Sequence, residues 1–222
     1  MPTTPPPALR GPVPGHVAWV ASGGGRPEEA AREERALVAL VEAALGLGVV
    51  WLTVQDPSGG RALRERAAEL ARRGVAVAGP LIGGPADGRA AAGGAGASRA
   101  RTAGPGGVVP PGEPALRVLL APEGSGRQEL VAAVRELAVR GVVPEEVSEA
   151  SISSALAVPD VDLLVLTGGD RRVPDLLIWQ VAYSEIVVLP DPWPEAPGAQ
   201  LHAAIGEYRR RDRRYGGLVA PR

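Results

Sequence analysis

The stretch HVAWVASGGGR, residues 16–26, joins a run of strand-forming residues to three glycines and an arginine. A chain builds such a turn where its backbone amides must approach a phosphate group closely, because glycine has no side chain to block the approach. A carboxylate that could hold a metal would normally follow the strand, but Ser22 stands there. The stretch therefore predicts a strand followed by a turn that can bind a phosphate group, but without the metal-binding carboxylate, which Ser22 replaces.

Short apolar runs rich in Val and Leu recur along the chain and alternate with helical patterns. We expect strands at 17–21, 49–55, 74–78, 116–121, 162–166 and 185–189. We expect helices at about 27–46, 61–73, 126–141, 145–157, 175–184 and 196–212, the fourth opening at Pro144. Strands of this kind are buried on both faces. The order predicts an α/β fold, with a mostly parallel six-stranded sheet, helices on both faces, and ligands at the carboxyl ends of the strands.

The composition limits the class of protein. A chain of 222 residues with 45% hydrophobic content has room for one α/β domain with a core. The formal net charge of −1 provides no overall field that would recruit nucleic acid. Cysteine is absent, which excludes disulfides and thiolate metal sites and fits a reducing compartment. We therefore expect a cytoplasmic domain that does not bind nucleic acid.

Two segments lack the residues needed for a core. Residues 1–15, MPTTPPPALRGPVPG, are proline-rich and contain no apolar stretch typical of a signal peptide. Residues 83–115 contain almost no large apolar side chain, so they cannot bury enough surface to offset the cost of ordering. We expect a disordered lead-in at 1–15 and a single domain over 16–222 with a disordered insert at about 83–115.

The apolar stretch at 36–54 has the length of a membrane span. Glu42 interrupts it, however, and Gly46 and Gly48 divide it into an amphipathic segment and a β-branched run. We interpret it as a helix, a turn and a strand of the domain.

A second informative block is DLLVLTGGDRRVPDLLIWQVAYSEIVVLPDPWPE, residues 162–195, and a third is YRRRDRRYGG, residues 208–217. Together with the first block, their order and spacing resemble the cis-prenyltransferases, the family of undecaprenyl diphosphate synthase. In that family the blocks read approximately HVAxIMDGNGR, DLLIRTSGEQRxSNFLLWQxAYSELYF followed by WP, and RxRRFGG. The resemblance covers most of the chain outside 1–15 and 83–115.

The resemblance implies a reaction between two prenyl diphosphates. In the family an allylic diphosphate and isopentenyl diphosphate lie end to end, and the allylic pyrophosphate leaves as the new C–C bond develops. Mg²⁺ and arginines neutralise the phosphates. A hydrophobic tunnel, walled by the helices that follow the second and third strands, takes up the growing chain.

The first block retains only part of the family's pattern. Gly23, Gly25 and Arg26 fall on the diphosphate-binding turn. The metal-holding aspartate corresponds to Ser22, and the asparagine after it corresponds to Gly24. The neutral hydroxyl of Ser22 cannot replace a charged oxygen ligand for a hard cation. The resemblance therefore implies diphosphate contacts without a catalytic aspartate.

The second block is also divided. Arg172 falls on a phosphate-binding arginine, and Glu185 falls on the acidic residue associated with magnesium. The arginine expected before the threonine is Leu166, and the usual serine is Pro174.

The rest of the chain shows losses and retentions of the same kind. The aromatic-rich loop after the second strand is replaced by VQDPSGGR, and the tunnel-wall helices correspond to 83–115. Arg127 fits the arginine of the family's GGRxE motif. Arg214 and Gly216 preserve the RxG motif at the C-terminus and are assigned to diphosphate binding.

Several of the retained residues also have purely structural interpretations. Arg26 could be a solvated cap, and Glu185 could be a surface residue at the start of a strand. We interpret Trp193 as core packing and His16 as structural rather than as an acid or base. Residues 209–214 could be a solvated basic helix end.

This combination of loss and retention resembles the Nogo-B receptor type of subunit, which keeps the fold and the RxG tail but lacks the aspartate and the tunnel. We therefore expect a non-catalytic subunit of a heterodimeric cis-prenyltransferase, with Mg²⁺ in the partner's or a shared site and peripheral membrane contact left open. One alternative is a divergent active transferase or short-chain prenyl diphosphate enzyme in which Arg172 and Glu185 manage the diphosphate. Another is a prenyl diphosphate-binding scaffold.

Overall fold

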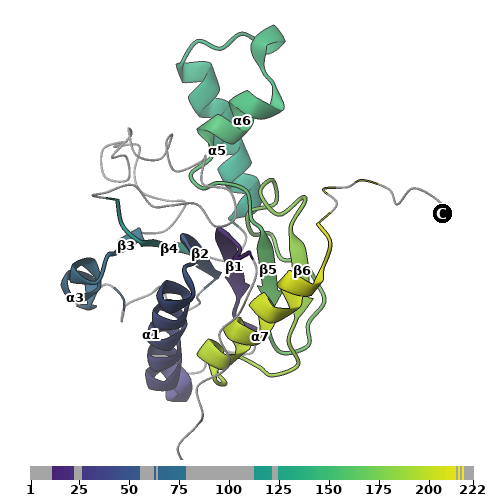
Figure 1. Ribbon diagram of the computed structural model, residues 1–222. Helices are drawn as coiled ribbons and strands as arrows, with labels where there is room; N and C mark the ends of the chain where they lie inside the picture. Colours follow the sequence, from purple (N-terminus) through teal and green to yellow (C-terminus); the bar gives the residue numbers. More distant parts are fainter. Residues whose placement is uncertain are drawn as a thin grey trace, which may run out of the picture.

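The computed structural model describes residues 12–22, 27–55, 63, 65–78, 113–121, 125–213, 215 and 217. Six strands form one sheet in the order β3-β4-β2-β1-β5-β6, and every neighbouring pair is parallel (Figure 1). The strands are β1 (His16–Val20), β2 (Trp51–Gln55), β3 (Val75–Ala78), β4 (Leu116–Ala121), β5 (Leu163–Leu166) and β6 (Glu185–Val188). The predicted six-stranded α/β sheet is confirmed. Of the predicted lead-in at 1–15, residues 1–11 lie outside the described residues, and so do residues 83–112 of the predicted insert at 83–115.

The strand register defines two ends of the sheet. β1 is central, because Val17 pairs with Leu52 of β2 on one side and with Leu163 of β5 on the other. Every residue of β1 is buried, as expected for an apolar strand covered on both faces. We call the side where the strands begin the amino end of the sheet and the side where they finish the carboxyl end.

One face of the sheet is covered by α1 (Ala30–Leu47) and α7 (Pro197–Arg210), which also pack against each other (Figure 1). Leu37, Leu40 and Val41 of α1 are buried, with the spacing of an amphipathic helix. α1 ends at Gly48, whose φ of 80° is readily adopted by glycine. The interpretation of 36–54 as helix, turn and strand is therefore confirmed. Within the described ranges, no helix is both long and apolar enough to cross a bilayer.

On the other face, among the residues that the structure describes, non-helical segments around Val158 and Leu176 pack on β1 and β5. The helix predicted at 175–184 is wrong, because the segment is a series of turns. Leu177 has a φ of 47°, which a helix cannot accommodate, and its side chain is fully buried. The apolar pattern of the segment therefore reflects burial against the sheet rather than helical periodicity.

α5 (Gly126–Val139) and α6 (Glu149–Ala155) form a hairpin that extends beyond the sheet (Figure 1). The single helix predicted at 145–157 is instead a 3₁₀ turn, η2 (Pro144–Glu146), followed by α6. Ser148 causes this separation, because it caps α6 in a reciprocal hydrogen-bonded box with Ser151. Elsewhere η1 (Pro27–Glu29) precedes α1, and the helix expected at 61–73 is described as α3 (Ala67–Arg72).

Candidate functional site

At the carboxyl end of the sheet, Thr167 ties β5 to β1. The buried Thr167 hydroxyl donates a hydrogen bond to the Val20 carbonyl over 3.0 Å and accepts one from the Ser22 amide over 3.0 Å. The Ser22 carbonyl accepts a further hydrogen bond from the Trp193 amide over 3.2 Å. Ser22 is therefore held in place through its backbone from two sides, at the position where the resemblance predicts a metal-binding aspartate.

Gly168 completes this region. Its φ of 74° lies in the left-handed region, and its amide donates to the Asp191 carbonyl over 2.9 Å. A Cβ at this position would lie 3.6 Å from the Ser22 Cβ. The ends of β1 and β5 and the Asp191 segment therefore meet at one place. Gly23, Gly24, Gly25 and Arg26, which would complete the turn, lie outside the described residues.

Arg172 lies in the loop after β5, and its side chain is 90% exposed. Its guanidinium binds both oxygens of Asp170, with Nη2 to Oδ2 at 2.8 Å and Nε to Oδ1 at 3.1 Å. This contact lowers the pKa of Asp170 to about 2, chiefly through the side-chain hydrogen bond from Arg172. Arg172 is accessible to a phosphate in solution, but a ligand would compete with Asp170 for its fork.

The N-terminus of α5 already holds a carboxylate from the chain itself. The Arg127 amide donates to Asp175 Oδ1 over 3.0 Å, and the Gly126 amide donates to the Asp175 carbonyl over 3.1 Å. A negative group is favourable at this end of a helix. Arg127, which fits the family motif, keeps an exposed side chain.

Glu185 lies at the opposite end of the sheet from Ser22. It is the first residue of β6 and pairs with Leu163, the first residue of β5. Its carboxylate accepts a hydrogen bond from Arg211 Nη1 over 3.2 Å. The structure does not bring Glu185 and Ser22 together within this chain.

The donors of this chain do not fit a complete magnesium site. Mg²⁺ requires several oxygen ligands, usually including one or two carboxylates. The part of the chain that the structure describes contains no group of three or more His, Cys, Asp or Glu residues that could hold a metal. Ser22 offers only a neutral hydroxyl and Glu185 is bound to an arginine, so we assign this chain no step that requires a metal of its own.

Sequence reasoning missed a cluster at the amino end. Asp162, just before β5, forms an ion pair with Arg213, just after α7, and each side chain is only 16% exposed. The Arg213 guanidinium lies 4.5 Å from the ring centroid of Tyr215 and 5.7 Å from that of Tyr208. The only sequence signal is an acid at a strand start and a basic run after the last helix. Arg214 and Gly216, on either side of Tyr215, lie outside the described residues.

His16, at the start of β1, is 1% exposed. Its ring nitrogens lie 2.9 Å from the Pro159 carbonyl and 2.9 Å from Thr53 Oγ1. Burial lowers the pKa of His16 to about 4, so the ring is neutral near pH 7. A buried, hydrogen-bonded and neutral histidine fits the structural interpretation.

Known proteins resemble this chain in sequence. Residues 113–216 match the family described as "Putative undecaprenyl diphosphate synthase". An isoprenyl transferase of Rhizobium meliloti is 39% identical over 113 residues, which are 48% of this chain and 46% of the relative. Isoprenyl transferase 2 of Bradyrhizobium diazoefficiens is 40% identical over 47% of this chain and 44% of the relative. These matches span about half the length of those relatives.

A longer match covers nearly the whole chain. The ditrans,polycis-undecaprenyl-diphosphate synthase ((2E,6E)-farnesyl-diphosphate specific) of Xanthomonas axonopodis pv. citri is 31% identical over 95% of this chain and 91% of its own length.

Two solved structures share the fold. One is lavandulyl diphosphate synthase from Lavandula x intermedia in complex with dimethylallyl diphosphate, with a TM-score of 0.62, 20% identity, and coverage of 92% of this chain and 99% of that one. The other is a probable undecaprenyl diphosphate synthase from Campylobacter jejuni, with a TM-score of 0.63, 16% identity, and coverage of 94% and 100%.

Proposed function

Because this chain belongs to the cis-prenyltransferase family of isoprenyl transferases, we propose that it is the non-catalytic subunit of a heteromeric cis-prenyltransferase that makes a polyprenyl diphosphate. Its partner in this proposal is a conventional family member that retains the metal-binding aspartate. The substrates of the complex are an allylic diphosphate and isopentenyl diphosphate, and the active site belongs to the partner.

The observation that carries the proposal is the state of the carboxyl end of the sheet. Ser22 follows β1, and its backbone is tied to Thr167 and Trp193. A hydroxyl at this position supplies no negative charge to attract a hard cation. The ends of the strands keep their arrangement while the charged group is missing, as expected for a chain that preserves the fold without the chemistry.

Magnesium in this proposal is held by the partner or in a site shared with it, where it would neutralise the diphosphates. This chain's own contribution is cationic. Arg214 of the RxG motif would reach the partner's active site, and its guanidinium would offer a bidentate pair of hydrogen bonds to a phosphate. Arg213, next to it, is bound to the body of the domain through Asp162, which supports a defined path for the tail.

The alternative of a divergent active enzyme is favoured by one observation. Arg172 is highly exposed, so it is available to a diphosphate in this chain itself. In that case the chain alone would turn over prenyl diphosphates, and removal of Arg172 would abolish the reaction.

The experiment compares the purified chain with a co-expressed complex. Each is incubated with isopentenyl diphosphate, farnesyl diphosphate and Mg²⁺, and polyprenyl products are separated by chain length. We expect no condensation by the chain alone, and none from Ser22→Asp alone, because the family's arginine and serine are also replaced, by Leu166 and Pro174, and the tunnel-wall helices are not preserved. The complex should be active. Turnover by the isolated wild-type chain at ordinary enzyme rates would overturn the proposal in favour of the divergent enzyme.

Arg214 provides the sharper test within the complex. Arg214→Ala should lower kcat/KM by about ten-fold or more, because a hydrogen bond to a charged group contributes roughly 1.5–3 kcal/mol. Arg214→Lys should lower kcat/KM less than Arg214→Ala does, but still measurably, because the ammonium group of lysine cannot form the bidentate pair of hydrogen bonds that a guanidinium offers. Arg210→Ala is the matched control, because Arg210 is 70% exposed and pairs with Glu207 on its own helix. If Arg214→Ala changes kcat/KM of an active complex as little as this control does, the tail has no role there and the scaffold hypothesis is favoured.

A further inference from the structure

Asp162 is held rigidly at the start of the central strands. Its Oδ2 accepts hydrogen bonds from the Gly15 amide over 2.8 Å and from the His16 amide over 3.1 Å. Its other oxygen, Oδ1, accepts from Arg213. The carboxylate is therefore a fixed acceptor that joins the beginning of β1 to the segment after α7.

Arg213 is fully engaged by this acceptor and by two aromatic rings. Besides the ion pair, its Nη1 lies 3.2 Å from the Tyr208 hydroxyl oxygen. The rings of Tyr208 and Tyr215 lie beside its guanidinium at distances that favour cation–π attraction. Tyr208 belongs to the last turn of α7, whereas Tyr215 lies beyond Arg213, so the arginine links the helix to the chain that follows it.

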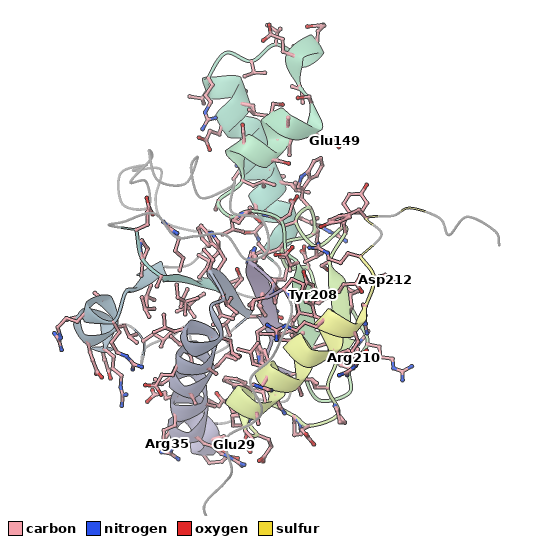
Figure 2. The ribbon with its side chains drawn as sticks, in the orientation of Figure 1. Glu29, Arg35, Glu149, Tyr208, Arg210 and Asp212 are labelled. Atoms are coloured by element: carbon pink, nitrogen blue, oxygen red, sulfur yellow. The ribbon has the colours of Figure 1, made fainter. Side chains whose placement is uncertain are left out.

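Glu185 binds a second arginine, Arg211, which lies two residues before Arg213. Arg211 Nη1 donates to the Glu185 carboxylate and, over 2.7 Å, to the Ile186 carbonyl of β6. Arg211 ends α7 with extended backbone angles, φ −93° and ψ 141°. In an extended segment, residues two apart point to the same side. Asp212, between the two anchored arginines, is exposed at the end of α7 (Figure 2).

We propose that Asp162 and Glu185 form a two-point anchor that fixes where the C-terminal tail leaves the domain and so positions Arg214 for the partner's active site. This inference rests on the proposed function for the role of Arg214. Asp162, Glu185, Arg211 and Arg213 are positioning residues, because none of them needs to touch substrate.

The physical advantage of such an anchor is preorganisation. A free tail must lose conformational entropy when it enters a partner's site, and that loss weakens every contact it makes there. Arg214 directly follows Arg213 and precedes Tyr215, whose ring contacts Arg213. Both of its neighbours are thus ordered before any partner arrives. A small displacement of a group that stabilises a transition state is enough to slow a reaction by a large factor.

The anchor itself is tested on the isolated full-length chain. The sequence contains no cysteine, so Gly217→Cys accepts a single nitroxide label on the tail. Asp162→Asn breaks the ion pair but keeps an oxygen for the Gly15 and His16 amides, and Arg213→Gln breaks the pair from the tail side. Both substitutions should narrow the lines of the electron paramagnetic resonance spectrum, which indicates greater mobility of the label. Glu136→Gln, which breaks a half-exposed pair with Arg140 on α5, is the control and should change nothing.

The positioning role is tested in the complex by a double-mutant cycle. Asp162→Asn should leave the complex assembled and lower kcat/KM on the order of ten-fold, mainly through kcat. In an Arg214→Ala background the same substitution should have no further effect, because the anchor acts through Arg214. An equal loss in both backgrounds would show a merely structural role and overturn the positioning claim.

Glu185→Gln separates the anchor from the magnesium role that the resemblance implies. If Glu185 holds the tail, the substitution increases label mobility in the isolated chain and leaves the Mg²⁺ concentration for half-maximal activity of the complex unchanged. A shift in that concentration without a change in mobility would contradict the anchor at Glu185.

The label-mobility experiment tests the anchor, and the activity assays test the proposed function, so each can fail without the other. Unchanged spectra in both Asp162→Asn and Arg213→Gln would overturn the anchor whatever the activity of the complex. Increased label mobility in these variants, together with activity of the isolated wild-type chain, would support the anchor but overturn the proposed function.

Discussion

At the carboxyl end of the sheet, Ser22, Thr167 and Gly168 are joined by backbone amides, carbonyls and one hydroxyl, whereas at the amino end Asp162 and Glu185 each bind an arginine of the C-terminal segment. Parallel α/β sheets place their ligands at the carboxyl ends of the strands. In this chain the carboxylates that hold the tail lie at the other end. The comparison indicates that the carboxylates of Asp162 and Glu185 hold the C-terminal segment of this chain. At the carboxyl end, where ligands usually bind, neutral groups join Ser22, Thr167 and Gly168.

The largest expected effect concerns the amino end, where His16 makes stability depend on pH. Its pKa is about 4 in the folded chain and 6.5 in the unfolded chain, so the unfolded state binds more protons between these values. The His16 contribution is complete above pH 6.5 and is lost progressively as the pH falls toward 4, by about 3 kcal/mol in total. Urea unfolding at several pH values should show this slope in the wild type.

His16→Gln should remove that component of the slope. His202→Gln is the matched control, because it leaves His16 as the only histidine of the chain. Identical slopes in the two variants would show that the buried ring is not the group responsible.

The next largest effect tests packing beside the carboxyl end, at Gly126 where α5 begins. A Cβ there would meet Asp175 Oδ1 at 2.8 Å and the Ile178 backbone nitrogen at 3.2 Å. Gly126→Ala should therefore destabilise the fold by about 1–3 kcal/mol. Gly46→Ala is the control, because a Cβ at this position within α1 meets nothing within 4 Å.

Gly46→Ala should raise the stability by about 0.5–1 kcal/mol, because alanine is the better helix former. Thermal unfolding of both variants checks the opposite signs. A rise in Tm for Gly126→Ala would mean that the Asp175 segment can move away, and the carboxyl end would be looser than the comparison requires.

A smaller effect is expected from Thr167→Val, which removes the hydroxyl that joins β1 to β5. The substitution leaves the Ser22 amide and the Val20 carbonyl without this partner, at a cost of about 1–2 kcal/mol. Thr167→Ser keeps the hydroxyl and should lose less. Denaturant midpoints measured at constant m-value provide the comparison. If Thr167→Val loses no more stability than Thr167→Ser, which keeps the hydroxyl, the hydroxyl contributes little and the account of a hydroxyl-tied carboxyl end is weakened.

The smallest effect on stability is expected at Arg172. Its pair with Asp170 is exposed, so Arg172→Ala should leave Tm unchanged, as should Arg140→Ala at the exposed pair on α5. Only Arg172→Ala should weaken the binding of isopentenyl diphosphate, measured by titration calorimetry, if Arg172 is the phosphate contact that the family resemblance implies. Equal affinities in the two variants would remove Arg172 from the candidate site.

Local pattern was sufficient for most of the fold. The predicted strand at 116–121 matches β4, and the one at 185–189 matches β6 to within one residue, because a buried strand is a short continuous apolar run. The helix predicted at 175–184 failed for a related reason. Leu176 and Leu177 are both fully buried, and a pattern of burial does not distinguish a helix from turns pressed against a sheet.

The candidate site was predictable only where a motif names a residue. The family resemblance placed Ser22 at the end of the first strand and Arg172 in the loop after the fifth. It also groups Glu185 with the magnesium site, which stays a prediction. The parallel register puts Glu185 at the amino end, bound to Arg211. A motif states which residue types recur, but the neighbours of each residue depend on the order of the strands in the sheet.

The sequence by itself determined the α/β class, the positions of the strands and the absence of an acid after the first one, because hydrophobic runs and residue identity are local properties. Only the tertiary structure decided that Asp162 meets Arg213, 51 positions away along the chain. That contact requires β5 to lie beside β6, and α7 to pack against both. The physical reason is that an ion pair depends on distance in space, which the packing of the whole sheet sets and which no short segment encodes.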